Sequence, residues 1–130
     1  MSSFARLSAY RPYALAALRI ITALLFIEHG TMKLFGFPAS QMAGPLSPLM
    51  LFAALLELVG GLLILVGLLT RPVAFLLAGE MAVAYFMAHA PSSFFPVVNQ
   101  GDAAILFCFV FLYLAFSGPG AFAIENRKPA

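Results

Sequence analysis

The sequence is poor in charge, in cysteine and in tryptophan. Charged residues make up only 9% of its 130 residues, and hydrophobic residues make up 63%. A soluble domain carries about 25% charged residues, because its surface has to be hydrated. This composition excludes a water-soluble globular domain and predicts a multi-pass protein that associates with the lipid bilayer. The formal net charge of +2 does not indicate nucleic-acid binding, since basic residues that flank membrane spans explain it.

The single cysteine, Cys108, lies within an apolar run. One cysteine excludes a disulfide within the chain and a two-cysteine thiol relay. The sequence also contains no Walker loop, dinucleotide fingerprint, zinc-ligand set or serine triad, and we predict no metal site. Any chemistry therefore depends on the few ionisable residues inside the apolar segments.

Four apolar segments predict an all-α fold, in which residues 1–130 form a single membrane domain with a bundle of four transmembrane helices. The predicted helices cover about residues 13–35, 49–70, 72–90 and 102–117. Asp102 is placed to act as the N-cap of the last helix. The glycines Gly60, Gly61 and Gly67 predict that neighbouring helices approach the second helix closely.

Basic residues gather on one side of the predicted membrane. With four spans, this side carries Arg6, Arg11, Arg71, Arg127 and Lys128. The two loops on the opposite side contain no lysine or arginine. The positive-inside rule therefore predicts that the N- and C-termini are both cytoplasmic.

Ionisable residues nevertheless occur inside the predicted spans. Each one costs roughly 2.5–3.5 kcal/mol on insertion scales, so partners on other helices have to compensate for it. At 1.5 Å per residue, Arg19 and Glu80 lie roughly 9 and 12 Å from the cytoplasmic ends of their helices, and Glu57 lies near mid-membrane. We expect these three residues to form an inner cluster in which Arg19 pairs with Glu57 or Glu80. Such a cluster is either a structural ion network or a site for protons or substrate.

A second group of polar residues lies toward the outer face. Glu28 and His29 are the candidate catalytic residues, because a carboxylate and an imidazole can bind the carbonyls of a quinone and relay its protons. The candidate cofactor-binding residues are His29, Lys33, His89 and Asp102. His29 and His89 come out at the same depth, roughly 24–26 Å from the cytoplasmic side, so a haem between them is an alternative cofactor. The other interpretation is that these are interfacial side chains, with Lys33 extending to the membrane surface.

Several motifs of the chain resemble those of the DoxX family, and together they cover nearly its whole length. The motifs are Arg19 followed by FIEHGTMKLFG (Phe26–Gly36), ELVGGLL (Glu57–Leu63) with GLLTR (Gly67–Arg71), Glu80-Met81, and GPGAF (Gly118–Phe122). Residues 123–125 depart from the family pattern, since Ala-Ile-Glu stands where a Ser-Leu-Asp-like sequence is expected.

This resemblance implies a small four-helix protein of the bacterial inner (plasma) membrane. The family includes proteins similar to the membrane subunits of thiosulfate:quinone oxidoreductase, and other members are linked with thiol or oxidative-stress handling as partners of soluble redox proteins. We therefore expect a membrane subunit of a quinone-linked oxidoreductase or of a thiol redox system, with a soluble partner that supplies the redox centre. The alternatives are a non-enzymatic membrane adaptor or assembly protein, whose buried charges are structural, and a carrier of small solutes or protons that acts as a homo-oligomer.

Overall fold

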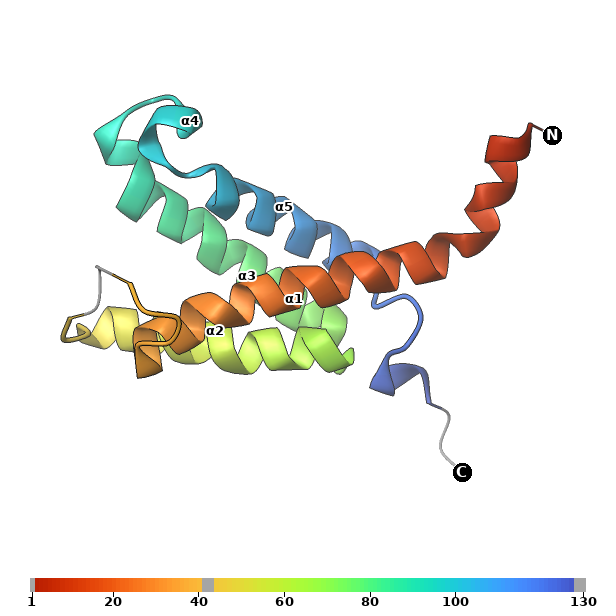
Figure 1. Cartoon of the computed structure of the whole chain (residues 1–130), viewed down its shortest axis with the longest axis horizontal. Helices are drawn as coiled ribbons and strands as arrows, with labels where there is room; N and C mark the ends of the chain where they lie inside the picture. Colours follow the sequence, from red (N-terminus) through yellow and green to blue (C-terminus); the bar gives the residue numbers. More distant parts are fainter. Residues whose placement is uncertain (1, 41–43, 128–130) are drawn as a thin grey trace.

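The computed structural model describes residues 2–40 and 44–127, and this part of the chain consists of helices and connecting segments without any strand (Figure 1). This confirms the predicted all-α class. In chain order the elements are η1 (Ser3–Tyr10), α1 (Arg11–Phe35), α2 (Pro48–Val66), α3 (Thr70–Ala84), η2 (Tyr85–His89), η3 (Ala90–Ser92), α4 (Pro96–Asn99), α5 (Asp102–Ser117) and η4 (Ile124–Asn126).

The long helices pack as two antiparallel pairs. α1 lies along α2, α3 lies along α5, and contacts between α2 and α3 join the pairs. The backbones of α1 and α5 come close at only a few positions. Figure 1 shows the pairs close together at the end where α1 begins and further apart at the end that carries α4. We call the first the basic end, because Arg11 and Arg71 lie there, and the second the outer end.

The centre of the bundle is apolar and rich in aromatic rings. Phe26 of α1 and Phe111 of α5 are almost completely buried, and their ring centroids lie 4.9 Å apart in an edge-to-face arrangement. Leu77 of α3 and Ile64 of α2 complete this core. The buried residues of α1 include Arg19 and Gly30, so the same helix face that forms the core also carries a charge.

Most helix boundaries agree with the predicted ones. The predicted third helix, about residues 72–90, is divided into α3, which ends at Ala84, and the π-helix η2, which ends at His89. α2 ends at Val66, four residues earlier than predicted, because Gly67 adopts a left-handed conformation (φ +70°) and its N–H bonds the carbonyls of Leu63 and Ile64. α5 has the predicted bounds, but its N-cap is Gly101. Asp102 is the first residue of this helix, so the predicted capping role was wrong.

Two of the three glycines in the second apolar segment lie where helices touch, as predicted. A Cβ atom at Gly60 would lie 2.9 Å from Leu77 of α3, and one at Gly61 would lie 2.6 Å from Ile27 of α1. Gly67 differs, because a Cβ there would lie 2.3 Å from Ala123, in the segment after α5. The sequence did not predict that this segment folds back onto the bundle.

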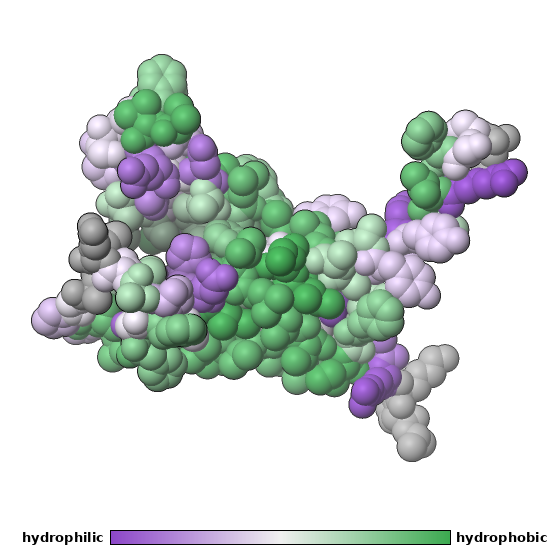
Figure 2. Space-filling view, in the orientation of Figure 1, coloured by the Kyte–Doolittle hydropathy of each residue, from purple (hydrophilic) through white to green (hydrophobic). Residues whose placement is uncertain are grey.

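The surface has the character expected of a protein in lipid. Among the residues that the structure describes, three helical stretches are long and apolar enough to cross a membrane, namely Ser3–Phe35, Pro48–Val66 and Thr70–Ser92. α5 is a shorter apolar helix of 16 residues. Figure 2 shows an apolar surface over the middle of the molecule, with hydrophilic residues mainly toward its two ends. The fourth span and the cytoplasmic location of both termini stay predictions, and residues 128–130 of the predicted basic tail lie outside the described residues.

Candidate functional site

A buried ion pair joins α1 to α2. The Lys33 Nζ lies 2.7 Å from Oε1 and 3.0 Å from Oε2 of Glu57, so the ammonium donates to both carboxylate oxygens. Only 4% of the Glu57 side chain and 21% of the Lys33 side chain are exposed. Side chains on a helix lean toward its N-terminus, and this carries the Lys33 ammonium from the last turn of α1 back toward the middle of α2.

Glu80 of α3 lies beside this ion pair. Both of its carboxylate oxygens are shielded from solvent, and neither accepts a hydrogen bond from the described residues. The Glu57 carboxyl is its electrostatic neighbour, and Lys33 is the nearby opposite charge. One ammonium and two carboxylates sum to a charge of −1. We call Lys33, Glu57 and Glu80 the acidic cluster.

The predicted pairing of Arg19 with Glu57 or Glu80 was wrong. The guanidinium of Arg19, which is completely buried, donates to backbone carbonyls of the segment after α5. Its Nη1 bonds the carbonyls of Pro119 and, at 3.0 Å, of Ala121, and its Nη2 lies 2.9 Å from the carbonyl of Phe122. The Nε is shielded and has no partner among the described residues.

We call the segment whose carbonyls bind Arg19 the tail (residues 118–126). Further hydrogen bonds connect the tail to the basic end. The Glu125 N–H donates to the Gly67 carbonyl at 3.0 Å. The Glu125 carboxylate accepts hydrogen bonds from the N–H, at 3.2 Å, and the hydroxyl of Thr70, and it is the acidic neighbour of Arg19. Arg19 and the acidic cluster are therefore separate sites.

Glu28 and His29 lie on an exposed part of α1. The His29 ring packs edge-to-face against Phe107 of α5, with centroids 5.7 Å apart. In the described part of the chain, neither side chain forms a hydrogen bond or an ion pair with the acidic cluster. Their catalytic role stays a prediction, and the structure places both residues on the exposed surface of α1.

His89 has a polar environment that the sequence analysis missed. Its Nδ1 lies 3.0 Å from the Asn99 carbonyl oxygen, and its ring stacks on Tyr85. The buried Asn99 side chain bonds the Tyr85 hydroxyl at 3.1 Å and the Gly101 N–H at 2.8 Å. The signal in the sequence was the pair of amide residues, Asn99 and Gln100, that follows an apolar run just before the last helix. His89 and His29 thus have different neighbours, and Asp102 is exposed.

A cavity of about 260 Å³ adjoins Lys33 at the outer end. It is lined by Met32, Lys33, Gly36, Ser40, Gly44, Leu46 and Met50. The lysine therefore faces the Glu57 carboxylate and also borders a cavity between the end of α1 and the beginning of α2. Within the described ranges, no group of three or more His, Cys, Asp and Glu side chains is placed to hold a metal ion.

The sequence profile of the DoxX family matches residues 14–90, which include all three members of the acidic cluster. The chain belongs to the DoxX family. This confirms the resemblance seen in the sequence.

Three relatives of this DoxX protein match it over most of their length. A Haemophilus influenzae protein, named only as uncharacterized, is 46% identical over 127 residues, which cover 93% of this chain and 95% of the relative. The Escherichia coli inner membrane protein YqjF is 36% identical over 122 residues, 85% of this chain and 90% of the relative. The Escherichia coli inner membrane protein YphA is 30% identical over 135 residues, 92% of this chain and 93% of the relative. No solved structure matches the chain significantly.

Three findings support the same location. The chain belongs to the DoxX family, two of its relatives are named inner membrane proteins, and its helices include apolar ones long enough to cross a membrane. This DoxX protein is a multi-pass protein of the inner membrane. Its acidic cluster and Arg19 are therefore charges held within membrane-spanning helices.

Proposed function

We propose that this protein is the membrane subunit of a quinone-linked redox system, and that the acidic cluster is its proton-exchanging site for a quinone head group. The observation that carries the proposal is the Glu80 carboxyl, which is shielded from solvent, accepts no hydrogen bond from the described residues and lies beside the Lys33–Glu57 ion pair. Ionisable residues are rare within membrane helices, and where they occur they commonly mark proton or substrate pathways.

The charge balance of the cluster supports a role in proton transfer. With both carboxyls ionised the site carries a net negative charge, and low-dielectric surroundings penalise it. One proton shared by Glu57 and Glu80 makes the site neutral. A proton held in this way is available to a bound acceptor, and the carboxyls regain it from the aqueous side.

Quinone reduction needs the groups that the cluster provides. A quinone takes up two electrons and two protons to become a quinol. The Lys33 ammonium can donate a hydrogen bond to a quinone carbonyl, which stabilises the negative charge that develops on that oxygen. Glu57 and Glu80 can pass protons to it, and a soluble redox protein supplies the electrons. The cavity beside Lys33 provides an approach from the outer end.

Infrared difference spectroscopy of the protein in lipid vesicles tests this proposal. We expect decylubiquinone, added to the parent protein, to change the absorption band of a protonated carboxyl group. In Glu80→Gln this change should disappear and quinone affinity should fall at least about tenfold, which corresponds to about 1.4 kcal/mol. Glu28→Gln is measured in parallel, since Glu28 and His29 are the catalytic residues predicted from the sequence.

The outcomes separate the alternatives. Loss of the band in Glu28→Gln with retention in Glu80→Gln would move the site to the exposed face of α1. An unchanged parent spectrum would remove the quinone proposal altogether. Thermal melting in detergent provides the folding control, and it should change little in Glu80→Gln because glutamine keeps the size of the side chain and its amide can donate to the neighbouring Glu57 carboxyl.

A second candidate function is a membrane adaptor. The observation that favours it is the tail, which Arg19 and Thr70 hold in a fixed conformation at the basic end and which can present Ile124 and Asn126 to a partner. In this case Ile124→Asp should abolish recovery of a partner protein from detergent extracts while the membrane level of the protein stays unchanged. The same partner recovered with parent and variant would exclude this surface.

A further inference from the structure

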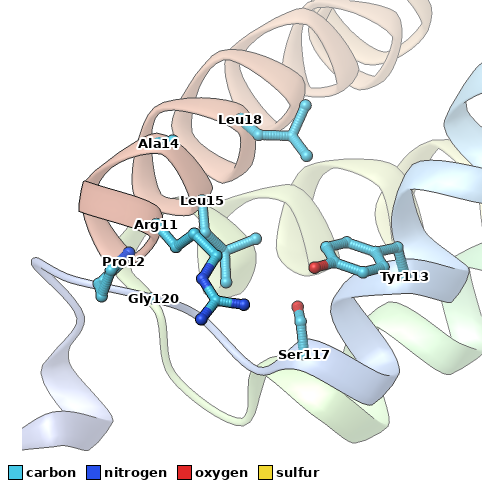
Figure 3. A pocket seen from close by; sticks show the side chains of 8 residues that line it. All are labelled: Arg11, Pro12, Ala14, Leu15, Leu18, Tyr113, Ser117 and Gly120. Atoms are coloured by element: carbon cyan, nitrogen blue, oxygen red, sulfur yellow. The ribbon is translucent and has the colours of Figure 1, made fainter. Parts of the chain in front are cut away.

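A second and larger cavity, of about 600 Å³, lies at the basic end between α1 and α5 (Figure 3). It is lined by Arg11, Pro12, Ala14, Leu15, Leu18, Tyr113, Ser117 and Gly120. None of these residues belongs to the acidic cluster, and none of them is acidic. This cavity is therefore a separate site with its own chemistry.

The helix packing explains why a groove is present here. α1 packs mainly on α2, and α5 packs mainly on α3, so the backbones of α1 and α5 stay apart. Aromatic side chains such as Phe26 and Phe111 fill the space between them at the centre of the bundle, and the groove lies beyond this contact, at the basic end. At the base of the groove, the Ala121 N–H bonds the Pro12 carbonyl at 2.9 Å and joins the tail to α1. The groove opens sideways, since 37% of Leu18 and 57% of Tyr113 are exposed. In a membrane-embedded bundle this opening faces lipid.

Polar groups from both helices point into the groove. Figure 3 shows the Arg11 guanidinium extending into it, with the Tyr113 and Ser117 hydroxyls on the opposite wall. The Arg11 Nε donates to the Ser8 carbonyl at 3.3 Å, and its two terminal nitrogens make no hydrogen bond to the described residues. The Ser117 hydroxyl donates to the Gly118 carbonyl at 2.9 Å, which leaves the Tyr113 hydroxyl as a second donor for a ligand.

We propose that this groove binds an anionic phospholipid of the adjacent leaflet. Its volume lies within the roughly 300–1,000 Å³ typical of small-molecule sites. A guanidinium binds phosphate oxygens with two parallel hydrogen bonds, and the Tyr113 hydroxyl donates a third. Leu15 and Leu18 provide an apolar wall for an acyl chain. A phospholipid fits both the polar donors and the apolar wall of this site, because it carries a phosphate and acyl chains in one molecule.

Native mass spectrometry of the protein, released from vesicles that contain equal amounts of phosphatidylglycerol and phosphatidylcholine, tests the proposal. We expect the parent to retain phosphatidylglycerol preferentially. Arg11→Gln should lower this retention at least about tenfold, equivalent to about 1.4 kcal/mol, and Tyr113→Phe should lower it less. Arg6→Gln is the matched control, since it removes one exposed positive charge from η1 outside the groove.

A steric variant distinguishes binding in the groove from a general effect of positive charge. Ala14→Phe fills the groove without changing the charge, and it should also reduce lipid retention. Equal losses in Arg6→Gln and Arg11→Gln would overturn the proposal in favour of diffuse attraction. Equal retention of the two lipids, or displacement of the bound lipid by millimolar inorganic phosphate, would also overturn it.

Discussion

Arg19 and Glu80 are both charged residues inside membrane helices, but their surroundings differ. Arg19 donates to three backbone carbonyls of the tail and has Glu125 as its acidic neighbour. Glu80 accepts no hydrogen bond from the described residues, although both of its oxygens are shielded. The carbonyls that surround Arg19 stabilise a fixed positive charge. The neighbours of Glu80 include a second carboxyl, so the charge of that site depends on a proton.

This contrast suggests different roles for the two residues. A buried charge with matched partners contributes to the structure that supplies those partners. A buried carboxyl without a donor is better stabilised when a proton or a ligand arrives. We therefore interpret Arg19 as the anchor of the tail and Glu80 as the reactive member of the acidic cluster. Substitutions in each region test this interpretation.

The largest loss of stability is expected for Arg19→Ala. The variant leaves the carbonyls of Pro119, Ala121 and Phe122 without their donor, and the unfolding free energy should fall by roughly 3–5 kcal/mol, as for other broken buried charge pairs. Thermal melting in detergent and the level of protein in membranes measure the effect. Arg19→Lys should retain part of the stability, because an ammonium keeps the charge without the planar geometry. An Arg19→Ala protein as stable as the parent would contradict the anchoring role.

Gly67→Ala should cause the next largest loss, and Gly36→Ala is its matched control. Both glycines have left-handed φ angles, +70° and +65°, so each substitution introduces backbone strain of roughly 1 kcal/mol. Only Gly67 also faces the tail, since its new Cβ would lie 2.3 Å from Ala123, whereas nothing lies within 4 Å at Gly36. The overlap should add roughly 1–3 kcal/mol, measured as the difference between the two melting curves. Equal losses would show that the tail does not contribute to stability.

A smaller effect is expected in the acidic cluster, where Lys33→Met removes the only ammonium. The loss should be roughly 1–3 kcal/mol, because uptake of a proton by a carboxyl relieves part of the unpaired charge. The double variant Lys33→Met/Glu57→Leu should recover most of this loss, since well-packed apolar residues replace a buried ion pair at little cost. Denaturation of the parent, both single variants and the double variant gives the coupling energy. Strictly additive losses would argue against a direct Lys33–Glu57 interaction.

The sequence predicted the positions of the long helices and the family of the protein. Apolar runs interrupted by glycine and proline predicted α1 and α5 to within a few residues, because local backbone preferences act at those positions. They also predicted the helical stretch that α3 and η2 form together, but not its change to a π-helix at Tyr85. The close approach of helices at Gly60 and Gly61 was also predicted, since small residues leave few other arrangements. The sequence did not predict the early end of α2, because the left-handed turn at Gly67 forms together with the tail that packs on it.

The amino-acid sequence alone indicates that charges are buried in a membrane and that they need partners. The packing of the folded chain selects those partners. Counting residues along straight helices placed Arg19 with Glu57 and Glu80, and Lys33 at the outer surface. In the folded protein, the backbone carbonyls of a non-helical tail compensate for Arg19, and a long side chain that leans back along its helix brings Lys33 to Glu57. The physical reason is that a buried charge needs hydrogen-bonding groups of suitable geometry, and the fold can supply them from backbone as well as from side chains of opposite sign.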